Sequence, residues 1–180
     1  MGIPSIPEED GMCLYSLLTS FSMLRGRPRK VLDLGAGIGY STLWMAKALE
    51  DSCGKKCEET ELVAVEQDPG YASIALRHLG KLKMVGVKLE VVNMKAQDYL
   101  KSPPPSSVDF AFIDIWEHEY IDVLKAMEEK LVDNGVIVFH NAFMPSPPRE
   151  FFMRANTRPW RSIVVPTRLG LLVVTKTQRA

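Results

Sequence analysis

Two apolar segments of the sequence end abruptly in polar side chains that could do chemistry. Residues 136–139 are Val-Ile-Val-Phe and are followed by His140 and Asn141, and the apolar run 108–113 is followed by Asp114. An imidazole with an ordinary pKa of about 6.5 can exchange protons near neutral pH or bind a metal. A carboxylate and a carboxamide supply oxygen ligands for a hard cation. These three residues are therefore candidates for proton transfer or for divalent-cation binding.

A glycine-rich turn could hold a nucleotide-like ligand. Residues 31–41 place Gly35, Gly37 and Gly39 between an apolar run and a helical pattern. Glycine lets the backbone approach a ligand closely, and a helix N-terminus behind the turn is a common ligand site. Such turns also occur for structural reasons alone.

Three further residues indicate which ligand this would be. Tyr40 stands where the dinucleotide fingerprint requires a small residue, which argues against an NAD-dependent reductase. Asp33 suits a cationic ligand group better than a pyrophosphate, and Glu66, at the end of the next apolar run, can accept hydrogen bonds from both ribose hydroxyls. The pattern favours a cationic nucleoside.

Alternating strands and helices are needed to position these residues. Strand patterns lie within residues 31–34, 62–66, 87–93, 108–116, 136–143 and, as a hairpin, 161–176; helical patterns lie within 7–26, 40–50, 68–82 and 119–131. We expect the last of these helices to end at the Asp-Asn-Gly of residues 133–135. The alternation predicts an α/β fold with a doubly wound, mostly parallel sheet and a C-terminal antiparallel hairpin.

Composition limits the class of protein. The 180 residues, 46% of them hydrophobic, fit a single domain over residues 1–180. The 22 basic and 22 acidic residues balance, so net charge calls for neither a nucleic-acid nor a membrane partner. No run reaches the roughly 20 apolar residues of a membrane span and no signal-peptide pattern is present, so we expect a cytoplasmic protein. Cys53 and Cys57 are either a local disulfide or two reduced loop thiols.

The glycine turn and two later segments resemble the first three motifs of the class I S-adenosylmethionine-dependent methyltransferases. The segments are residues 31–46, 63–69 and 91–100. The resemblance implies a Rossmann-like methyltransferase fold and S-adenosyl-L-methionine as cofactor. The cofactor would be bound by Asp33, Gly35, Ala36, Gly37, Tyr40 and Ser41 at its methionine part, Glu66 at its ribose, and Ala96, Gln97 and Asp98 at its adenine, with Gln67 as a further cofactor-binding residue. For Gln97 and Asp98 an ordinary helix start is the alternative interpretation.

From about residue 31 to the final hairpin the chain is similar to the catechol O-methyltransferase family. Members of that family bind a divalent metal through an Asp after the fourth strand and an Asp-Asn pair after the fifth. Asp114 and Asn141 match two of these ligands, and His140 replaces the third. The resemblance implies O-methylation of a small hydroxylated substrate, with Mg²⁺ or Mn²⁺ held by Asp114, His140 and Asn141. An imidazole ligand shifts the preference from Mg²⁺ toward Mn²⁺ and later transition metals.

The chain also differs from that family at the position of the general base. Its catalytic lysine corresponds to Glu117, which cannot act through the same cationic pairing. His140 is the first candidate to replace it, followed by His118 and Glu117, but a metal-bound His140 would not be free to take protons. The catalytic candidates are thus His140, Asp114 and Glu117. A metal-independent N- or RNA methyltransferase, and a cofactor-binding protein that has lost catalysis, remain alternatives.

The helical segment 1–27 is shorter than the family's N-terminal region, so we expect a more open pocket, or one with a roof formed by residues 144–160 and their aromatic and basic side chains. The alternative for these residues is an exposed charged connector with its aromatic side chains packed beneath it. A partner subunit in a homodimer is the other candidate for this roof.

Overall fold

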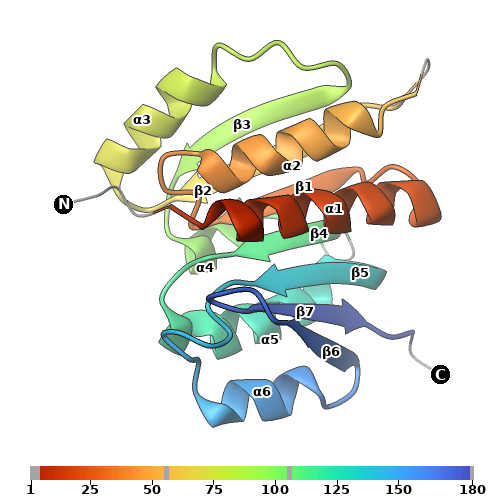
Figure 1. Cartoon of the computed structure of the whole chain (residues 1–180), viewed down its shortest axis with the longest axis vertical. Helices are drawn as coiled ribbons and strands as arrows, with labels where there is room; N and C mark the ends of the chain where they lie inside the picture. Colours follow the sequence, from red (N-terminus) through yellow and green to blue (C-terminus); the bar gives the residue numbers. More distant parts are fainter. Residues whose placement is uncertain (1–4, 55–56, 105–106, 179–180) are drawn as a thin grey trace.

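The centre of the molecule is a seven-stranded sheet of order β3-β2-β1-β4-β5-β7-β6 (Figure 1). The computed structural model describes residues 5–54, 57–104 and 107–178. The strands are β1 (Lys30–Leu34), β2 (Thr60–Glu66), β3 (Val87–Asn93), β4 (Val108–Ile113), β5 (Leu131–Phe139), β6 (Trp160–Val165) and β7 (Leu171–Lys176). Strands β1 to β5 pair in parallel, and β7 is antiparallel to both β5 and β6. The predicted mostly parallel sheet with a C-terminal antiparallel hairpin is confirmed.

Helices cover both faces of the sheet (Figure 1). They are α1 (Glu8–Arg25), α2 (Tyr40–Asp51), α3 (Pro69–Leu79), α4 (Ala96–Tyr99), the 3₁₀ turn η1 (Glu117–Glu119), α5 (Tyr120–Lys130) and α6 (Arg149–Ala155). Leu14 and Leu18 of α1 pack with Met45 of α2 on one face, whereas Leu124 of α5 and Phe151 of α6 are in the core on the other. Within the described residues, no helix combines the length and the apolar character that a membrane crossing requires.

Helix boundaries follow local chemistry at two of the expected positions. Asp68 caps α3 by accepting a hydrogen bond from the Tyr71 backbone N–H, and Pro69 is the first helical residue. Helix α1 ends at Gly26, whose φ of 92° suits glycine.

The helix expected over residues 119–131 is present as α5, but the prediction that Asp-Asn-Gly ends it is wrong. The helix ends at Lys130 and β5 begins at the next residue, so the Asp-Asn-Gly of residues 133–135 lies within the strand. Leu131 is fully buried opposite Val108, which requires extended backbone before the turn-like residues are reached. Those residues form an irregularity in the β4–β5 pairing, with Asn134 at a φ of 61°.

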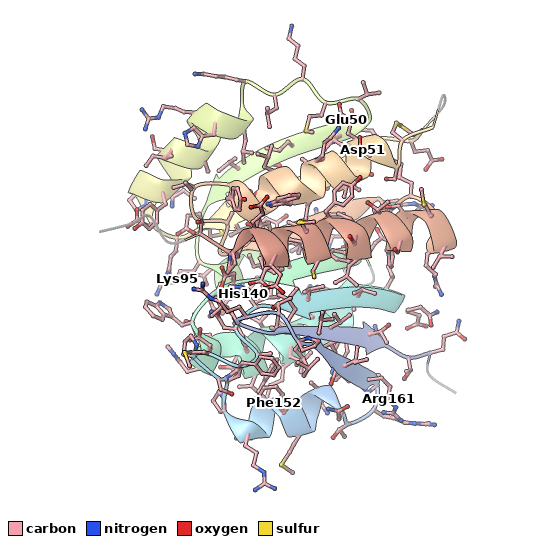
Figure 2. The ribbon with its side chains drawn as sticks, in the orientation of Figure 1. Glu50, Asp51, Lys95, His140, Phe152 and Arg161 are labelled. Atoms are coloured by element: carbon pink, nitrogen blue, oxygen red, sulfur yellow. A yellow bond between two sulfur atoms is a disulfide. The ribbon has the colours of Figure 1, made fainter. Side chains whose placement is uncertain are left out.

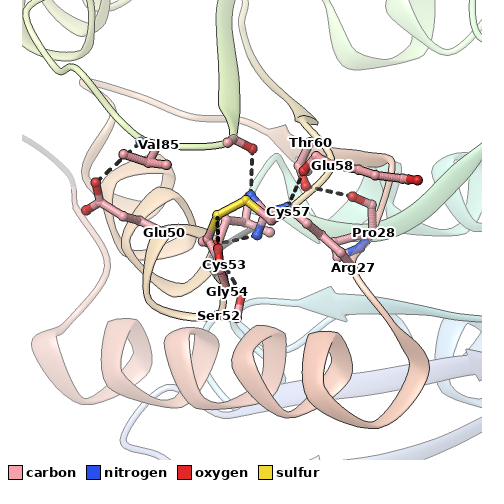
Figure 3. Close-up of a disulfide and its surroundings, with 12 residues drawn as sticks. Arg27, Pro28, Glu50, Ser52, Cys53, Gly54, Cys57, Glu58, Thr60 and Val85 are labelled. Carbon is pink, nitrogen blue, oxygen red and sulfur yellow. Dashed lines mark hydrogen bonds between the residues drawn. A yellow bond between two sulfur atoms is a disulfide. The ribbon is translucent and has the colours of Figure 1, made fainter.

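A disulfide and the hydrogen bonds of one arginine connect segments at the end of the sheet opposite the site. Cys53 and Cys57 form a disulfide, so the first of the two interpretations of these thiols holds (Figure 3). The guanidinium of Arg27 donates hydrogen bonds to three backbone carbonyls, that of Leu49 in the last turn of α2 and those of Glu58 and Gly86 in the loops before β2 and β3. Arg27 thereby links the starts of β1, β2 and β3.

Candidate active site

A cavity of about 530 Å³ opens where the central parallel strands end. Carboxyl ends of parallel strands meet at one edge of a sheet, which is where doubly wound folds bind ligands. The volume lies in the range of roughly 300 to 1,000 Å³ that is usual for small-molecule sites. Most of the predicted site residues line it: Gly35, Gly37, Glu66, Gln67, Ala96, Gln97, Asp114, Glu117, His140 and Asn141.

The remaining predicted cofactor residues do not line this cavity; they are Asp33, Ala36, Tyr40, Ser41 and Asp98. Asp33 is fully buried beneath the glycine turn and accepts hydrogen bonds from the hydroxyls of Ser41 and Thr42. Asp33 therefore braces the turn against the first residues of α2. Its contact with a cofactor stays a prediction.

The turn after β1 can form only with glycine at its first position. Gly35 has a φ of 90°, and a Cβ there would lie 2.1 Å from the backbone oxygen of Asp114. The backbone N–H of Gly35 donates to the carbonyl of Val65 at 2.9 Å. These constraints bring the turn against the ends of β2 and β4, so both strands can present side chains to the same cavity.

Two backbone N–H groups hold the side chain of Glu66 at the carboxyl end of β2. Its Oε2 accepts from the N–H of Gly37 at 2.8 Å, and its Oε1 accepts from the N–H of Asp68 at 2.7 Å. Each carboxylate oxygen can accept a second hydrogen bond. The carboxylate is therefore held in one orientation, with acceptor capacity left for a diol such as ribose.

At the ends of β4 and β5, His140 lies between two carboxylates. Its Nδ1 is 3.0 Å from Oδ1 of Asp114, and its Nε2 is 2.9 Å from Oδ2 of Asp10 on α1. Figure 2 shows His140 at the strand ends, beside α1. Burial opposes a charged imidazole, but the hydrogen bonds and negative charges of Asp114 and Asp10 outweigh it and raise the pKa of His140 above its ordinary value.

Asp10 is the functional candidate that the sequence interpretation missed. It is fully buried although it is an acid in the first turn of a helix. The available signal was spacing: Asp10 precedes the buried Leu14 by four residues and Leu18 by eight, and therefore lies on the buried face of α1. Other cavity-lining residues that were not predicted include Met94, Ile115, Tyr71 and Leu169.

Asn141 and Glu117 form a second pair at the same edge. Asn141 has left-handed backbone, with a φ of 55°, and its Nδ2 donates to Oε1 of Glu117 at 2.9 Å. Asparagine tolerates this conformation better than most residues. The pair holds the Glu117 carboxylate at the cavity wall, next to the exposed indole of Trp116.

The predicted metal set of Asp114, His140 and Asn141 does not fit this arrangement. A metal-binding imidazole needs a nitrogen lone pair directed at the ion. Both His140 nitrogens face carboxylate oxygens instead, so the imidazole offers no free ligand atom. Across the described ranges, no three His, Cys, Asp or Glu side chains are grouped so that they could hold a metal ion.

Residues 144–160, the candidate lid, do not cover the cavity. Phe151 and Trp160 are buried in the core, and the Phe151 ring lies 4.8 Å from that of Phe139. Figure 2 shows Phe152 on α6, well apart from His140. None of these residues lines the cavity.

Asp33 provides a pH prediction. Burial, opposed by the hydrogen bonds from Thr42 and Ser41 and reinforced by the charges of Asp114 and Glu66, raises the pKa of Asp33 from 3.8 to about 7. The folded state then binds more protons than the unfolded state between these values, so the free energy of unfolding falls as pH rises through about 4 to 7.

The variant Asp33→Asn lacks this titration and should show a flatter pH dependence than the wild type. Denaturant unfolding at several pH values between about 5 and 8 measures the difference in stability between the two proteins, in which contributions from other groups cancel. The wild type should lose stability relative to Asp33→Asn as pH rises. Parallel curves would mean that Asp33 is ionised throughout this range.

Comparison with known proteins places the chain in a family. Residues 32–142, more than half of the chain, match the methyltransferase domain family. The chain therefore belongs to the methyltransferase domain family. It is 27% identical over 164 residues to catechol O-methyltransferase B of Danio rerio, covering 88% of this chain and 57% of the relative. With catechol O-methyltransferase of Bos taurus it shares 28% identity over 141 residues, covering 73% and 48%. The chain spans about half the length of these curated relatives.

Solved structures share the fold. A methyltransferase from Geobacter sulfurreducens superimposes with a TM-score of 0.78 at 20% identity, covering 96% of this chain and 80% of that one. An O-methyltransferase from Bacillus cereus in complex with S-adenosylhomocysteine has a TM-score of 0.78 at 19% identity, covering 97% and 84%. The predicted Rossmann-like methyltransferase fold and the similarity to the catechol O-methyltransferase family are confirmed.

Proposed function

We propose that this protein transfers a methyl group from S-adenosylmethionine to a hydroxyl oxygen of a small acceptor. One observation carries the proposal. In a chain of the methyltransferase domain family, a single cavity joins the glycine turn and Glu66 to Asp114, His140 and Asn141. The first group suits the cofactor, and the second provides the acceptor side.

The charge of the cavity supports a cationic cofactor. The carboxylates that line it are those of Glu66, Asp68, Asp114, Glu117 and Glu119, and the described residues of its wall include no Lys or Arg. A sulfonium and an ammonium group gain Coulomb energy in such surroundings, whereas a pyrophosphate would be repelled. This agrees with the argument from Tyr40 against a dinucleotide.

The transfer depends mainly on positioning. When bound, S-adenosylmethionine would supply an electrophilic methyl group, and its sulfur would keep the electron pair of the broken bond as the methyl group joined the acceptor oxygen. Glu117, oriented by Asn141, takes the hydroxyl proton. We assign this role to Glu117 because both nitrogens of His140 are engaged. The exposed Trp116 offers an aromatic acceptor a stacking surface.

Cofactor binding should appear as a thermal shift. A ligand that binds only the folded state stabilises it, by about 2.7 kcal/mol at 100 times its dissociation constant. S-adenosylhomocysteine should raise the Tm of the wild type, and NAD should not. Glu66→Ala should lose most of the shift, while Glu61→Ala, on the same strand but outside the cavity wall, should retain it. A shift with NAD as large as that with S-adenosylhomocysteine would contradict the proposal.

The reaction is tested with isotope-labelled S-adenosylmethionine and a panel of hydroxylated aromatics, amines and short RNAs. We expect label on an acceptor oxygen, and slower turnover in Glu117→Gln with unchanged S-adenosylhomocysteine binding. Label on nitrogen or RNA alone would replace O-methylation by one of the alternatives. Cofactor binding without transfer to any acceptor would favour a protein that has lost catalysis. The cytoplasmic location and the homodimer remain predictions.

A further inference from the structure

We propose that Asp10 is a positioning residue of the active site: with Asp114 it engages both ring nitrogens of His140, so that methyl transfer here needs no divalent metal. The consequence for catalysis rests on the proposed function. The arrangement itself does not, and it can be tested separately.

The geometry of the three side chains excludes an open ligand position on His140. Nδ1 and Nε2 lie 3.0 and 2.9 Å from oxygens of Asp114 and Asp10, so each nitrogen is within hydrogen-bond distance of a carboxyl oxygen, and a protonated imidazole would donate to both. The side chains of Asp10 and His140 are 0% and 4% exposed, and that of Asp114 is 26% exposed. Neither nitrogen has a lone pair directed into the cavity that a metal ion could use.

Burial explains why Asp10 must be paired. A buried carboxylate without a partner is costly, and the second oxygen of Asp10, Oδ1, has no hydrogen-bond partner among the described residues. Its contact with His140 spans 130 positions of sequence and joins α1 to the end of β5. The contact thus gives a partner to an acid that lies on the same buried face of α1 as Leu14 and Leu18.

The network also replaces what a cation would do for the cavity. In the related family an acid stands at the position of His140, and two acids with an amide attract a divalent ion. Here the imidazole lies between the carboxylates of Asp10 and Asp114 and, when protonated, places one positive charge between them from within the chain. It also fixes the Asp114 carboxylate, which remains at the cavity wall. A metal that bound through His140 would have to break one of these contacts.

Nuclear magnetic resonance of the ring N–H protons tests the arrangement directly. His78 and His118 are exposed, so their ring protons should exchange rapidly with water, whereas the buried His140 should give two slowly exchanging downfield signals. Asp10→Asn should lose or shift the Nε2–H signal and retain Nδ1–H. Glu8→Gln, an exposed acid of the same helical turn, should change neither.

Metal dependence is then measured on the wild type, so the test stands even if Asp10→Asn does not fold. With S-adenosylhomocysteine bound, Mn²⁺ and Mg²⁺ should give no calorimetric binding and should leave both N–H signals in place. Methyl transfer should be unchanged by a chelator and should fall in Asp10→Asn through kcat, with S-adenosylhomocysteine affinity retained. A metal that displaces either N–H signal, or turnover that requires Mn²⁺ or Mg²⁺, would overturn the proposal. Failure to bind S-adenosylhomocysteine would instead defeat the proposed function and leave the N–H result standing.

Discussion

Replacing His140 by alanine is expected to lower the free energy of unfolding by about 3–5 kcal/mol, the cost of breaking a buried ion pair. The imidazole nitrogens lie within hydrogen-bond distance of both Asp10 and Asp114. Its removal leaves the carboxylate of Asp10 fully buried and without a donor. Denaturant unfolding of wild type and variant measures the loss directly.

Two further variants separate this effect from simple loss of volume. His118→Ala removes an exposed imidazole and should change stability by less than about 0.5 kcal/mol. The double variant Asp10→Asn/His140→Ala should be less destabilised than the sum of its single changes. The reason is that Asp10→Asn removes the buried carboxylate that His140→Ala leaves without a partner. If His140→Ala cost under about 1 kcal/mol, the pair would behave like a surface ion pair and the account of this network would fail.

The substitution Gly35→Ala is expected to abolish S-adenosylhomocysteine binding and to cost about 2–5 kcal/mol. Left-handed backbone costs a non-glycine residue roughly 1–2 kcal/mol, and overpacking a further 1–3 kcal/mol. Gly35 has a φ of 90°, and the added Cβ would meet the backbone oxygen of Asp114 at 2.1 Å. Relief requires the turn or the end of β4 to move, and either movement changes the cavity.

Gly26→Ala is the matched control for this experiment. Gly26 has a φ of 92°, but a Cβ there would meet nothing within 4 Å. It should therefore show the backbone cost alone, roughly 1–2 kcal/mol, with the thermal shift by S-adenosylhomocysteine preserved. Equal losses in the two variants would show that the contact with Asp114 is relieved without cost. Retained ligand binding in Gly35→Ala would contradict the assignment of this turn to the cofactor.

The sheet and one edge of the site could be predicted because their signals are local. Each apolar run is long enough to indicate a buried strand, and parallel strands bring their carboxyl ends together whatever the detail of the loops. Glu66, Asp114 and His140 each follow or end such a run, so their meeting at one cavity follows from topology. The cap at Asp68 likewise depends only on neighbouring residues.

The remaining features depend on contacts between distant segments. Asp10 meets His140 across 130 positions, and no local pattern assigns a donor to an acid on a helix. Residues 133–135 form turn-like sequence, yet the burial of Leu131 beside β4 extends the strand through them. The aromatic side chains of Phe151 and Trp160 could equally fill a core or cover a pocket; packing against α5 and β5 placed them in the core.

The most direct test of the account is a calorimetric titration of S-adenosylhomocysteine into the wild type, Glu66→Ala and Gly35→Ala. We predict saturable binding at one site in the wild type, and strongly weakened binding in both variants, because Glu66 and the glycine turn form the cofactor end of the cavity. Absence of binding to the wild type, or binding that neither variant affects, would contradict the claim that this cavity is the active site of a methyltransferase.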